Sequence, residues 1–319
     1  MSASFATALA AARDAAAAQH YPQGALYVVA TPIGNLADIT LRALRVLSSV
    51  EIICAEDTRS VQHLLTHHQV RAGTTPARIL SFFSGNEAAR TDEVIGLLRD
   101  GHDIALVSEA GMPGISDPGQ RLVAAAQDQR IRVEVIPGPS AALHALVASG
   151  LPSERFVFLG FPPRSEGQRL QLFGSLRHEP GTLIFYESPE RVAQTVADLA
   201  TALGADRRAV VARELTKLFE EHRRGTLGEL SHSLIAQPPR GEITLVVHGA
   251  DAQSTQPTAE TLDVEQEIRR RLAKGESAKD IATALTVILG QPRRKLYQLA
   301  LHLKETSDDA TSLDGVPAG

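Results

Sequence analysis

Short apolar segments alternate with amphipathic segments through the first half of this 319-residue chain, and no other feature restricts its fold more. The apolar segments are rich in β-branched residues and lie at residues 25–30, 51–56, 78–82, 103–108 and 132–137. The segments between them space their apolar residues as helices do. Runs that are apolar on both faces are typical of parallel strands covered by helices, so the sequence predicts an open α/β sheet.

A second set of strand candidates follows at residues 155–161, 182–188, 209–216 and 243–249. We therefore predict an α/β fold with two α/β domains and a small helical unit at the C-terminal end. The predicted boundaries are a flexible alanine-rich extension at residues 1–23, domains at 24–140 and 141–250, a linker at 251–260, a helix-turn-helix-like unit at 261–305 and a tail at 306–319.

Composition argues against several classes of protein. The formal net charge is -5, so no overall basic excess points to nucleic acid. Cys54 is the single cysteine, which leaves no intrachain disulfide, and its apolar neighbours predict a buried thiol. No stretch approaches the roughly 20 apolar residues of a membrane span, and no signal peptide is evident, so we predict a cytoplasmic protein.

A loop crowded with glycine and proline, SEAGMPGISDPG at residues 108–119, follows the fourth strand candidate. Glycine allows positive φ and a close approach of backbone to a ligand, and open α/β sheets bind ligands at the carboxyl ends of their strands. Similar loops occupy residues 28–40 and 135–142, where Ser140 is a plausible helix N-cap, and the three together predict one pocket. The alternative interpretation of the first loop is a tight strand–helix connection in which Asp117 caps the helix.

Other common sites find no support in the sequence. The chain has neither G-x-G-x-x-G nor G-x-x-x-x-G-K-[ST], which argues against an ordinary dinucleotide-binding fold and against a P-loop enzyme. His63 and His67 have the i, i+4 spacing of two metal ligands, but no third ligand is in view. We therefore predict no metal site and interpret the two histidines as part of an exposed helix face.

Eight motifs occur in the order expected of one family: TPIGNLADIT, EDTR, SEAGMPGISDPG, PGPSAA, GFPPR, FYESPER, RELTKLFEE and GEITLVV. Over about residues 24–305 they resemble the tetrapyrrole-methylase-like class of S-adenosylmethionine methyltransferases. Within this class, the chain is similar to the bacterial enzymes that methylate the ribose 2′-oxygen of a decoding-centre cytidine in 16S ribosomal RNA. Glu109 and Met112 depart from the commoner S-D-A-G-T-P form, at positions where contacts through the backbone should tolerate the change.

The resemblance implies that S-adenosylmethionine lies folded in a cleft between the two domains. Its implied contacts on the loops of the first half are Pro32, Gly34, Ser108, Glu109, Ala110, Gly111, Pro113, Ser116, Asp117, Pro137, Gly138, Pro139, Ser140 and Ala141. Its implied contacts in the second domain are Tyr186, Glu187, Ser188, Glu214, Thr216, Gly241, Glu242 and Ile243. A purely structural interpretation of FYESPER, with Ser188 as a helix N-cap, is compatible with this one.

Methyl transfer to a ribose hydroxyl predicts polar side chains beside the cofactor. The oxygen must attack the sulfonium methyl in line, and a general base or a cation near the developing alkoxide would help. We predict that Asp57 or Glu87 is this base or orients it, and that Arg59 and Lys217 hold phosphate or the oxygen. The alternative is structural: Asp57 caps the helix that starts near Thr58 and pairs with Arg59.

An RNA substrate requires basic side chains for phosphates and aromatic platforms for an exposed base. The basic candidates are Arg164, Arg191, Arg223, Arg224, Arg293, Arg294 and Lys295, and the aromatic ones are Phe82, Phe83, Phe161 and Phe219. The predicted partners are thus 16S ribosomal RNA and the small ribosomal subunit, together with a second copy of the chain in the homodimer that the resemblance implies. No membrane partner is predicted.

Two other functions remain open from the sequence. One keeps the class and changes the substrate to a corrin or porphyrin precursor. The other is a binding protein that senses the cofactor or assists ribosome assembly without turnover. The basic residues of the terminal helices and the EDTR and ELTKLFEE motifs favour the RNA enzyme.

Overall fold

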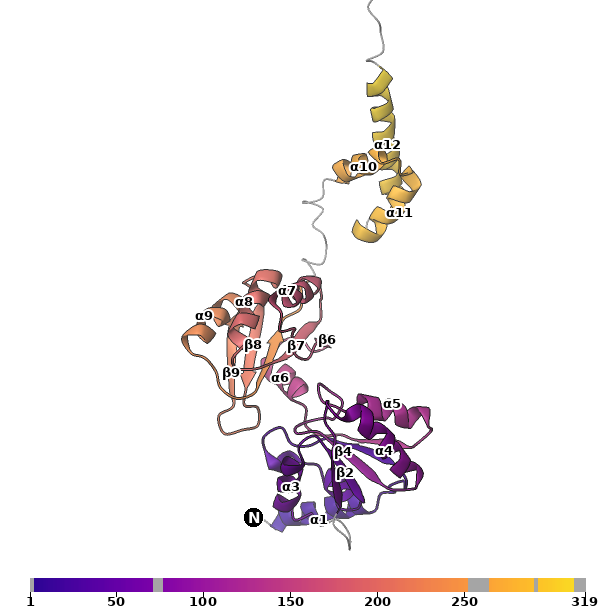
Figure 1. The fold of residues 1–319 in the computed structure, drawn as a ribbon. Helices are drawn as coiled ribbons and strands as arrows, with labels where there is room; N and C mark the ends of the chain where they lie inside the picture. Colours follow the sequence, from indigo (N-terminus) through magenta and orange to yellow (C-terminus); the bar gives the residue numbers. More distant parts are fainter. Residues whose placement is uncertain (1–2, 71–76, 252–263, 290–291, 313–319) are drawn as a thin grey trace, which may run out of the picture. The chain divides into compact units, whose positions relative to one another are not determined.

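The computed structural model describes residues 3–70, 77–251, 264–289 and 292–312 (Figure 1). Its contacts divide the chain into two compact units, Met1–Ser175 with Gly181–His248 and Leu176–Pro180 with Gly249–Gly319. The first unit contains two β-sheets. We call the part around the first sheet the first lobe (residues 3–140) and the part around the other the second lobe (residues 141–175 and 181–248).

Five parallel strands form the sheet of the first lobe, in the order β3-β2-β4-β1-β5. They are β1 (Leu26–Val29), β2 (Ile52–Ala55), β3 (Arg78–Ser81), β4 (Ile104–Val107) and β5 (Val133–Ile136). Each strand lies inside one of the five predicted apolar segments. The predicted open α/β sheet is therefore confirmed, and the carboxyl ends of all five strands meet at one edge.

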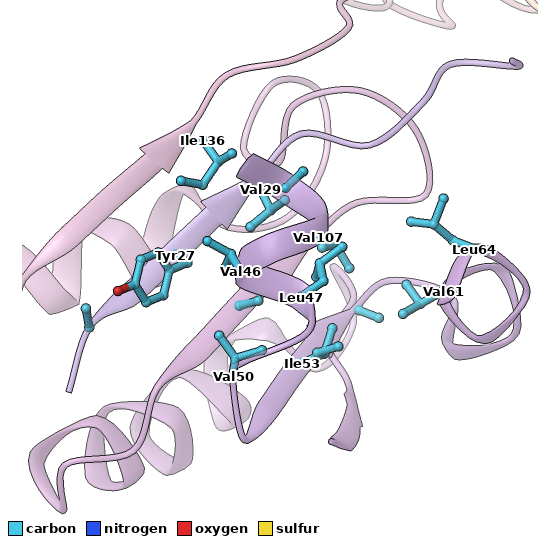
Figure 2. Close-up of a cluster of buried hydrophobic side chains, with 14 residues drawn as sticks. Tyr27, Val29, Val46, Leu47, Val50, Ile53, Val61, Leu64, Val107 and Ile136 are labelled. Atoms are coloured by element: carbon cyan, nitrogen blue, oxygen red, sulfur yellow. The ribbon is translucent and has the colours of Figure 1, made fainter. Parts of the chain in front are cut away.

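Helices cover both faces of this sheet: η1 (Leu36–Asp38), α2 (Leu41–Leu47), α3 (Thr58–His67), α4 (Glu87–Arg99) and α5 (Gln120–Asp128). Side chains alternate along a strand, so Tyr27 and Val29 of β1 face α2 and α3, whereas Leu26 and Val28 face α4 and α5. Figure 2 shows the first of these two clusters, with Leu47 of α2 packed over the sheet. Burial of each such large apolar side chain contributes about 1.5–3 kcal/mol.

Cys54 lies in the second cluster and is fully buried, as predicted. Burial raises the pKa of its thiol to about 12, so the thiol stays protonated.

Most of the predicted alanine-rich extension forms a helix, α1 (Ala3–Ala17). Alanine has the highest helix propensity, and α1 packs against α2 with Ala16 buried. The Tyr21 hydroxyl donates a hydrogen bond of 2.9 Å to the Ala16 carbonyl oxygen. The Arg45 guanidinium lies 5.6 Å from the centre of the Tyr21 ring, so this segment is tied to the lobe.

The second lobe has a mixed sheet in the order β6-β7-β10-β8-β9, in which only β6 and β7 pair in parallel. The strands are β6 (Phe156–Phe158), β7 (Thr182–Glu187), β8 (Arg208–Arg213), β9 (Glu221–Thr226) and β10 (Ile243–Val247). Strand β9 was not predicted, because its residues EHRRGT are polar. As an edge strand it needs no apolar alternation, and Glu221 pairs with Arg213 and Arg223 along it.

Four helices belong to this lobe: α6 (Ala141–Ser149), α7 (Glu166–Ser175), α8 (Val192–Leu203) and α9 (Leu227–Ala236). Leu146 of α6 packs on Ile184 of β7, whereas Phe173 of α7 meets the adjacent Phe185, so α6 and α7 cover opposite faces. A buried ion pair joins α7 to α8, with Arg169 Nε 2.6 Å from Asp198 Oδ2.

The second unit contains α10 (Val264–Ala273), α11 (Ala278–Leu289) and α12 (Arg293–Ser312). Its small core is made by Ile268, Ile281, Ala282, Leu285, Leu296, Ala300 and Leu303. The predicted pair of helices is thus preceded by a third, and α12 continues into the predicted tail. Residues 252–260 of the predicted linker and 313–319 of the tail lie outside the described residues. None of the described helices is long and apolar enough to span a bilayer.

Gly119 provides a test of how the loop after β4 is held. Its φ is +134°, and a Cβ built on it would lie 2.7 Å from Cδ2 of the buried Leu106. We expect Gly119→Ala to lower the free energy of unfolding by about 1–3 kcal/mol, through backbone strain and overpacking. Equilibrium urea unfolding measures the change.

The control is Gly96→Ala in the middle of α4, where a Cβ would meet nothing within 4 Å. Alanine is the better helix former, so this variant should gain about 0.5–1 kcal/mol. Equal losses in the two variants would show that the Gly119 conformation is not what matters.

Candidate functional site

Two of the glycine-rich loops are joined directly after β1 and β4. The Thr31 amide donates to the Gly111 carbonyl oxygen at 2.8 Å, and the Gly111 amide returns a bond of 3.1 Å to the Thr31 oxygen. Gly111 has a φ of +82°, which glycine adopts without strain. Ser108, only 2% exposed, donates through Oγ to the Gly111 carbonyl oxygen at 3.4 Å. The backbone of both loops is thereby fixed at the sheet edge.

A cavity of about 410 Å³, which we call the first cavity, lies beside these loops within the first unit. Both lobes contribute to it, and its volume is within the usual range for pockets that bind small molecules. The predicted cofactor residues that line it are Glu109, Ala110, Gly111, Ser116, Asp117, Ser140, Ala141, Tyr186, Glu187, Ser188, Gly241, Glu242 and Ile243. The three predicted loops and the second domain thus come together around one space.

The other predicted cofactor residues either line one of two further cavities or line none. A second cavity of about 460 Å³ includes Pro32, Gly34 and Ser108 in its wall, and a third of about 430 Å³ includes Pro139 and Thr216. The residues that line none of these three cavities are Pro113, Pro137, Gly138 and Glu214.

Gly138 and Glu214 instead hold the walls in place. A Cβ on Gly138 would lie 2.8 Å from that of Ala30, so only glycine lets these two loops approach so closely. The Glu214 carboxylate accepts a hydrogen bond of 3.0 Å from the Glu242 amide and lies against Gly241, where an added Cβ would collide with it.

Several residues in the wall of the first cavity were not among the predicted cofactor contacts: Ile33, Glu56, Met112, Ile115, Phe161, Pro189, Leu215 and Thr244. Most are apolar and carry no chemical signal of their own. Glu56 is different, because it follows the last residue of β2 at the ligand-binding edge of a parallel sheet. That position was the signal that could have found it.

Negative charge dominates the first cavity. Burial raises the pKa of Asp117 to about 6, and repulsion from the nearby Glu56 and Glu109 carboxylates adds to the shift. Burial also raises the pKa of Glu56, and repulsion from Glu109 adds to it. The residues in the wall include no lysine, arginine or histidine.

The turn after β8 brings a basic residue to the neighbouring second cavity. Lys217 Nζ lies 2.8 Å from Glu214 Oε1 and 3.0 Å from Glu242 Oε2. These hydrogen bonds raise the pKa of Lys217 although burial opposes them. Its side chain crosses Gly34, where a Cβ would lie 2.5 Å from Lys217 Cγ, so the second lobe contacts the loop after β1.

Of the four predicted catalytic residues, Arg59 and Lys217 line the second cavity, whereas Asp57 and Glu87 line none of the three. Asp57 caps α3 by accepting a bond of 2.8 Å from the Arg59 amide, and it pairs with the Arg59 guanidinium at 3.3 Å. Hydrogen bonds from Arg59 lower the pKa of Asp57. Glu87 accepts from the Gly119 amide at 2.9 Å. The structural interpretation of Asp57 is therefore observed, and the geometry lends no support to either carboxylate as a base.

Two helices have a different N-cap residue from the one predicted. The N-cap of α5 is Gly119 and not Asp117, and the N-cap of α8 is Arg191 and not Ser188. Both helices begin later than their proline residues suggested, which leaves Asp117 and Ser188 free to line the first cavity. Ser140 does occupy the N-cap of α6, although its side chain makes no capping hydrogen bond.

The aromatic candidates for RNA contact differ in exposure. Phe82 is 1% exposed and belongs to the core of the first lobe, so it is not a stacking platform. Phe83, Phe161 and Phe219 are exposed, and Phe161 also borders the first cavity.

The basic candidates differ in exposure and in the hydrogen bonds they make within the protein. Arg191 donates to the Pro162 carbonyl oxygen at 2.9 Å, and Arg223 donates to that of Gln237 at 2.8 Å, so both hold the second lobe together. Arg164 and Arg224 are exposed, although Arg224 also donates to the Ala148 carbonyl oxygen at 2.7 Å. In the second unit, the candidates Arg293, Arg294 and Lys295 are all exposed at the start of α12.

Known proteins resemble this chain in both sequence and fold. Residues 25–231 match the family Tetrapyrrole (Corrin/Porphyrin) Methylases. The Ribosomal RNA small subunit methyltransferase I of Mesorhizobium japonicum is 45% identical over 286 residues, which cover 89% of this chain and 94% of that protein. The protein of the same name from Synechocystis sp. is 45% identical over 281 residues, covering 88% and 99%.

Among solved structures, the methyltransferase CobJ matches with a TM-score of 0.55 and 16% identity, over 71% of this chain and 95% of that one. This likeness concerns the fold alone. It confirms the predicted arrangement of two α/β domains, and the sequence matches confirm the predicted methyltransferase class. The chain belongs to the tetrapyrrole methylase family and, within it, groups with the proteins named ribosomal RNA small subunit methyltransferase I.

Proposed function

We propose that this chain transfers the methyl group of S-adenosylmethionine to the ribose 2′-oxygen of a decoding-centre cytidine in 16S ribosomal RNA. One observation carries the proposal. The first cavity is lined by the family's loop motifs, and it shares Ile33, Glu109, Ala110 and Glu242 with a second cavity that contains basic side chains. A donor in the first cavity and a nucleotide in the second would meet across this shared wall.

The first cavity suits the methyl donor. Main-chain groups of the loop after β4 and small side chains such as Ser188 can hydrogen-bond an adenosine and an amino acid tail. Tyr186, Leu215 and Ile243 supply apolar surface for the rings. The chain uses S-adenosylmethionine as its donor, and the sulfonium supplies the electrophilic methyl group.

The second cavity suits a nucleotide of the acceptor. Arg59 is exposed, and its guanidinium can exchange the Asp57 carboxylate for a phosphate. Lys217 lies closer to the shared wall, where it can favour the developing alkoxide. The attack forms a carbon–oxygen bond while the carbon–sulfur bond breaks, the electron pair of that bond stays on sulfur, and the hydroxyl proton leaves to a base or to water.

The small ribosomal subunit and a second copy of the chain complete the proposal. Arg293, Arg294 and Lys295 stand exposed in the first turn of α12, where the helix N-terminus adds its own attraction for phosphate. For a cytoplasmic homodimer, exposed apolar side chains at Val147 and Phe219 offer a surface.

A labelling experiment tests the activity. The purified chain is incubated with donor labelled in its methyl group and either small ribosomal subunits or a porphyrin precursor. We expect label in the RNA, on the 2′-oxygen of a cytidine. Label in the pigment would favour the tetrapyrrole alternative, and binding without transfer to either would favour a non-catalytic protein.

A pair of variants ties this transfer to the first cavity. Ala141→Phe places a large ring in the cavity wall, so donor binding should weaken at least about tenfold, as measured by calorimetry. Ala124→Phe on the exposed face of α5 is the matched control and should bind normally.

A variant at Arg59 tests the second cavity without changing the wall of the first. We expect Arg59→Ala to lower the rate of methyl transfer about 10- to 100-fold, because a cation at the acceptor is lost. The donor dissociation constant should stay within about threefold, since Arg59 does not line the first cavity. Near-normal turnover would remove Arg59 from the site.

The matched variant is Asp57→Ala, which breaks the same ion pair and removes the α3 cap. It should cost about 1 kcal/mol of stability and leave the transfer rate near normal. A rate loss as large as that of Arg59→Ala would instead support Asp57 as the base.

The terminal helices have a test of their own. Arg293→Glu with Arg294→Glu reverses two exposed charges on α12, and we expect affinity for the small subunit to fall at least about tenfold with a shallower dependence on salt. The donor dissociation constant should not change. Lys274→Glu with Lys279→Glu reverses two exposed charges on the same unit away from that turn, and an equal loss there would argue against a specific role for α12.

A further inference from the structure

We infer that Glu56, together with Glu109 and Asp117, makes the first cavity selective for the positively charged methyl donor over its neutral product. Glu56 is the residue that this inference adds, as a specificity-determining side chain. The inference rests on the proposed function, because it concerns the ligand of the same cavity.

The sheet explains why Glu56 reaches the loop after β4. Parallel pairing sets Ala55, the last residue of β2, beside Val107, the last residue of β4. The next residues along the two strands, Glu56 and Ser108, therefore leave the sheet together. Besides burial, repulsion from Glu109 raises the pKa of Glu56, and repulsion from Glu56 raises that of Asp117, so the three carboxylates lie close enough to interact.

Five carboxylates belong to the wall of the first cavity, and two of them have a cation nearby. Glu187 pairs with Arg191 at 3.3 Å, and Glu242 pairs with Lys217 at 3.0 Å. In the part of the chain that the structure describes, no ion pair is made by the other three, which are Glu56, Glu109 and Asp117. Their negative charge faces the cavity without a compensating basic side chain.

Keeping these carboxylates ionised costs free energy when no ligand is bound. Burial and mutual repulsion disfavour the ionised forms of Glu56 and Asp117, which is why the pKa of each is raised. A cation placed among these carboxylates relieves the repulsion. A neutral ligand of the same shape does not.

The donor and its product differ in this one respect. The donor carries a sulfonium in addition to its ammonium and carboxylate groups, so it has one net positive charge. Transfer of the methyl group leaves a thioether, and the product has no net charge. Hydrogen bonds to the ribose and the adenine are common to both ligands, so the carboxylates favour the donor and the reaction itself weakens binding.

Calorimetry on the full chain with three ligands tests the inference: S-adenosylmethionine, S-adenosylhomocysteine and the analogue that carries an amine in place of the sulfonium. We expect the wild type to bind both charged ligands more tightly than S-adenosylhomocysteine. Glu56→Gln should reduce this preference about tenfold, the effect of one charge several ångströms away at intermediate dielectric. The loss should fall on the charged ligands, with S-adenosylhomocysteine changed less than about threefold.

Two further variants and a fold check complete the experiment. Asp117→Asn should act in the same direction as Glu56→Gln, and circular dichroism should show that both variants are folded. Glu190→Gln removes an exposed carboxylate just beyond Pro189 that does not line the cavity, and it should leave the preference unchanged.

The outcomes separate this inference from the proposed function. If Glu56→Gln weakens all three ligands by the same factor, Glu56 holds the ribose or the adenine and the inference is wrong, while the proposed function stands. If the wild type binds none of the three ligands, the proposed function itself is wrong and the inference with it.

Discussion

Parallel pairing between β1 and β4 aligns Val28 with Leu106, so the loops that follow these strands leave the sheet at the same edge. The Thr31–Gly111 bridge then joins the two loops through their backbones, which leaves side chains such as those of Ile33 and Glu109 free to line the cavities. The second lobe supplies the remaining walls of the first cavity at this edge. A buried sheet with helices on both faces is what makes such a fixed edge possible.

The two adjoining cavities differ in the charged side chains of their walls. The first has five carboxylates and no basic side chain in its wall, whereas the second has Arg59 and Lys217 beside the shared Glu109 and Glu242. Lys217 bonds Glu242 at the boundary that the cavities share, so its charge is held next to the first cavity without lining it. In the proposed function, a cationic donor in the first cavity and a polyanionic acceptor in the second would each meet side chains of opposite charge.

Sequence patterns predicted the structure correctly where one physical rule determined it. The inner strands β1, β2 and β4 were predicted because burial on both faces requires apolar runs, and the edge strands β3 and β5 were predicted from shorter runs of the same kind. The motif loops were located because glycine and proline mark unusual backbone. For neighbouring residues of the same type, the patterns did not show which one is buried. The adjacent Phe82 and Phe83 look alike, yet Phe82 is buried in the core and Phe83 is exposed. The polar strand β9 depends on its pairing with β8, which no local pattern contains, whereas Glu56 begins the EDTR motif directly after β2 and could have been found from that position.

Backbone strain concentrates around the same region. Among the described residues with positive φ that are not glycine, Ser116, Glu214 and Thr216 belong to the cavity walls or their support. Each such conformation costs about 1–3 kcal/mol, so surrounding contacts must hold it. Glu220 does so for Thr216 by accepting a hydrogen bond of 2.7 Å from its amide, and the Lys217 pairs do so for Glu214. The apolar core of the first sheet extends to this edge through Val29 and Val107, the last residues of β1 and β4, and its stability lets the chain keep strained residues beside the cavities.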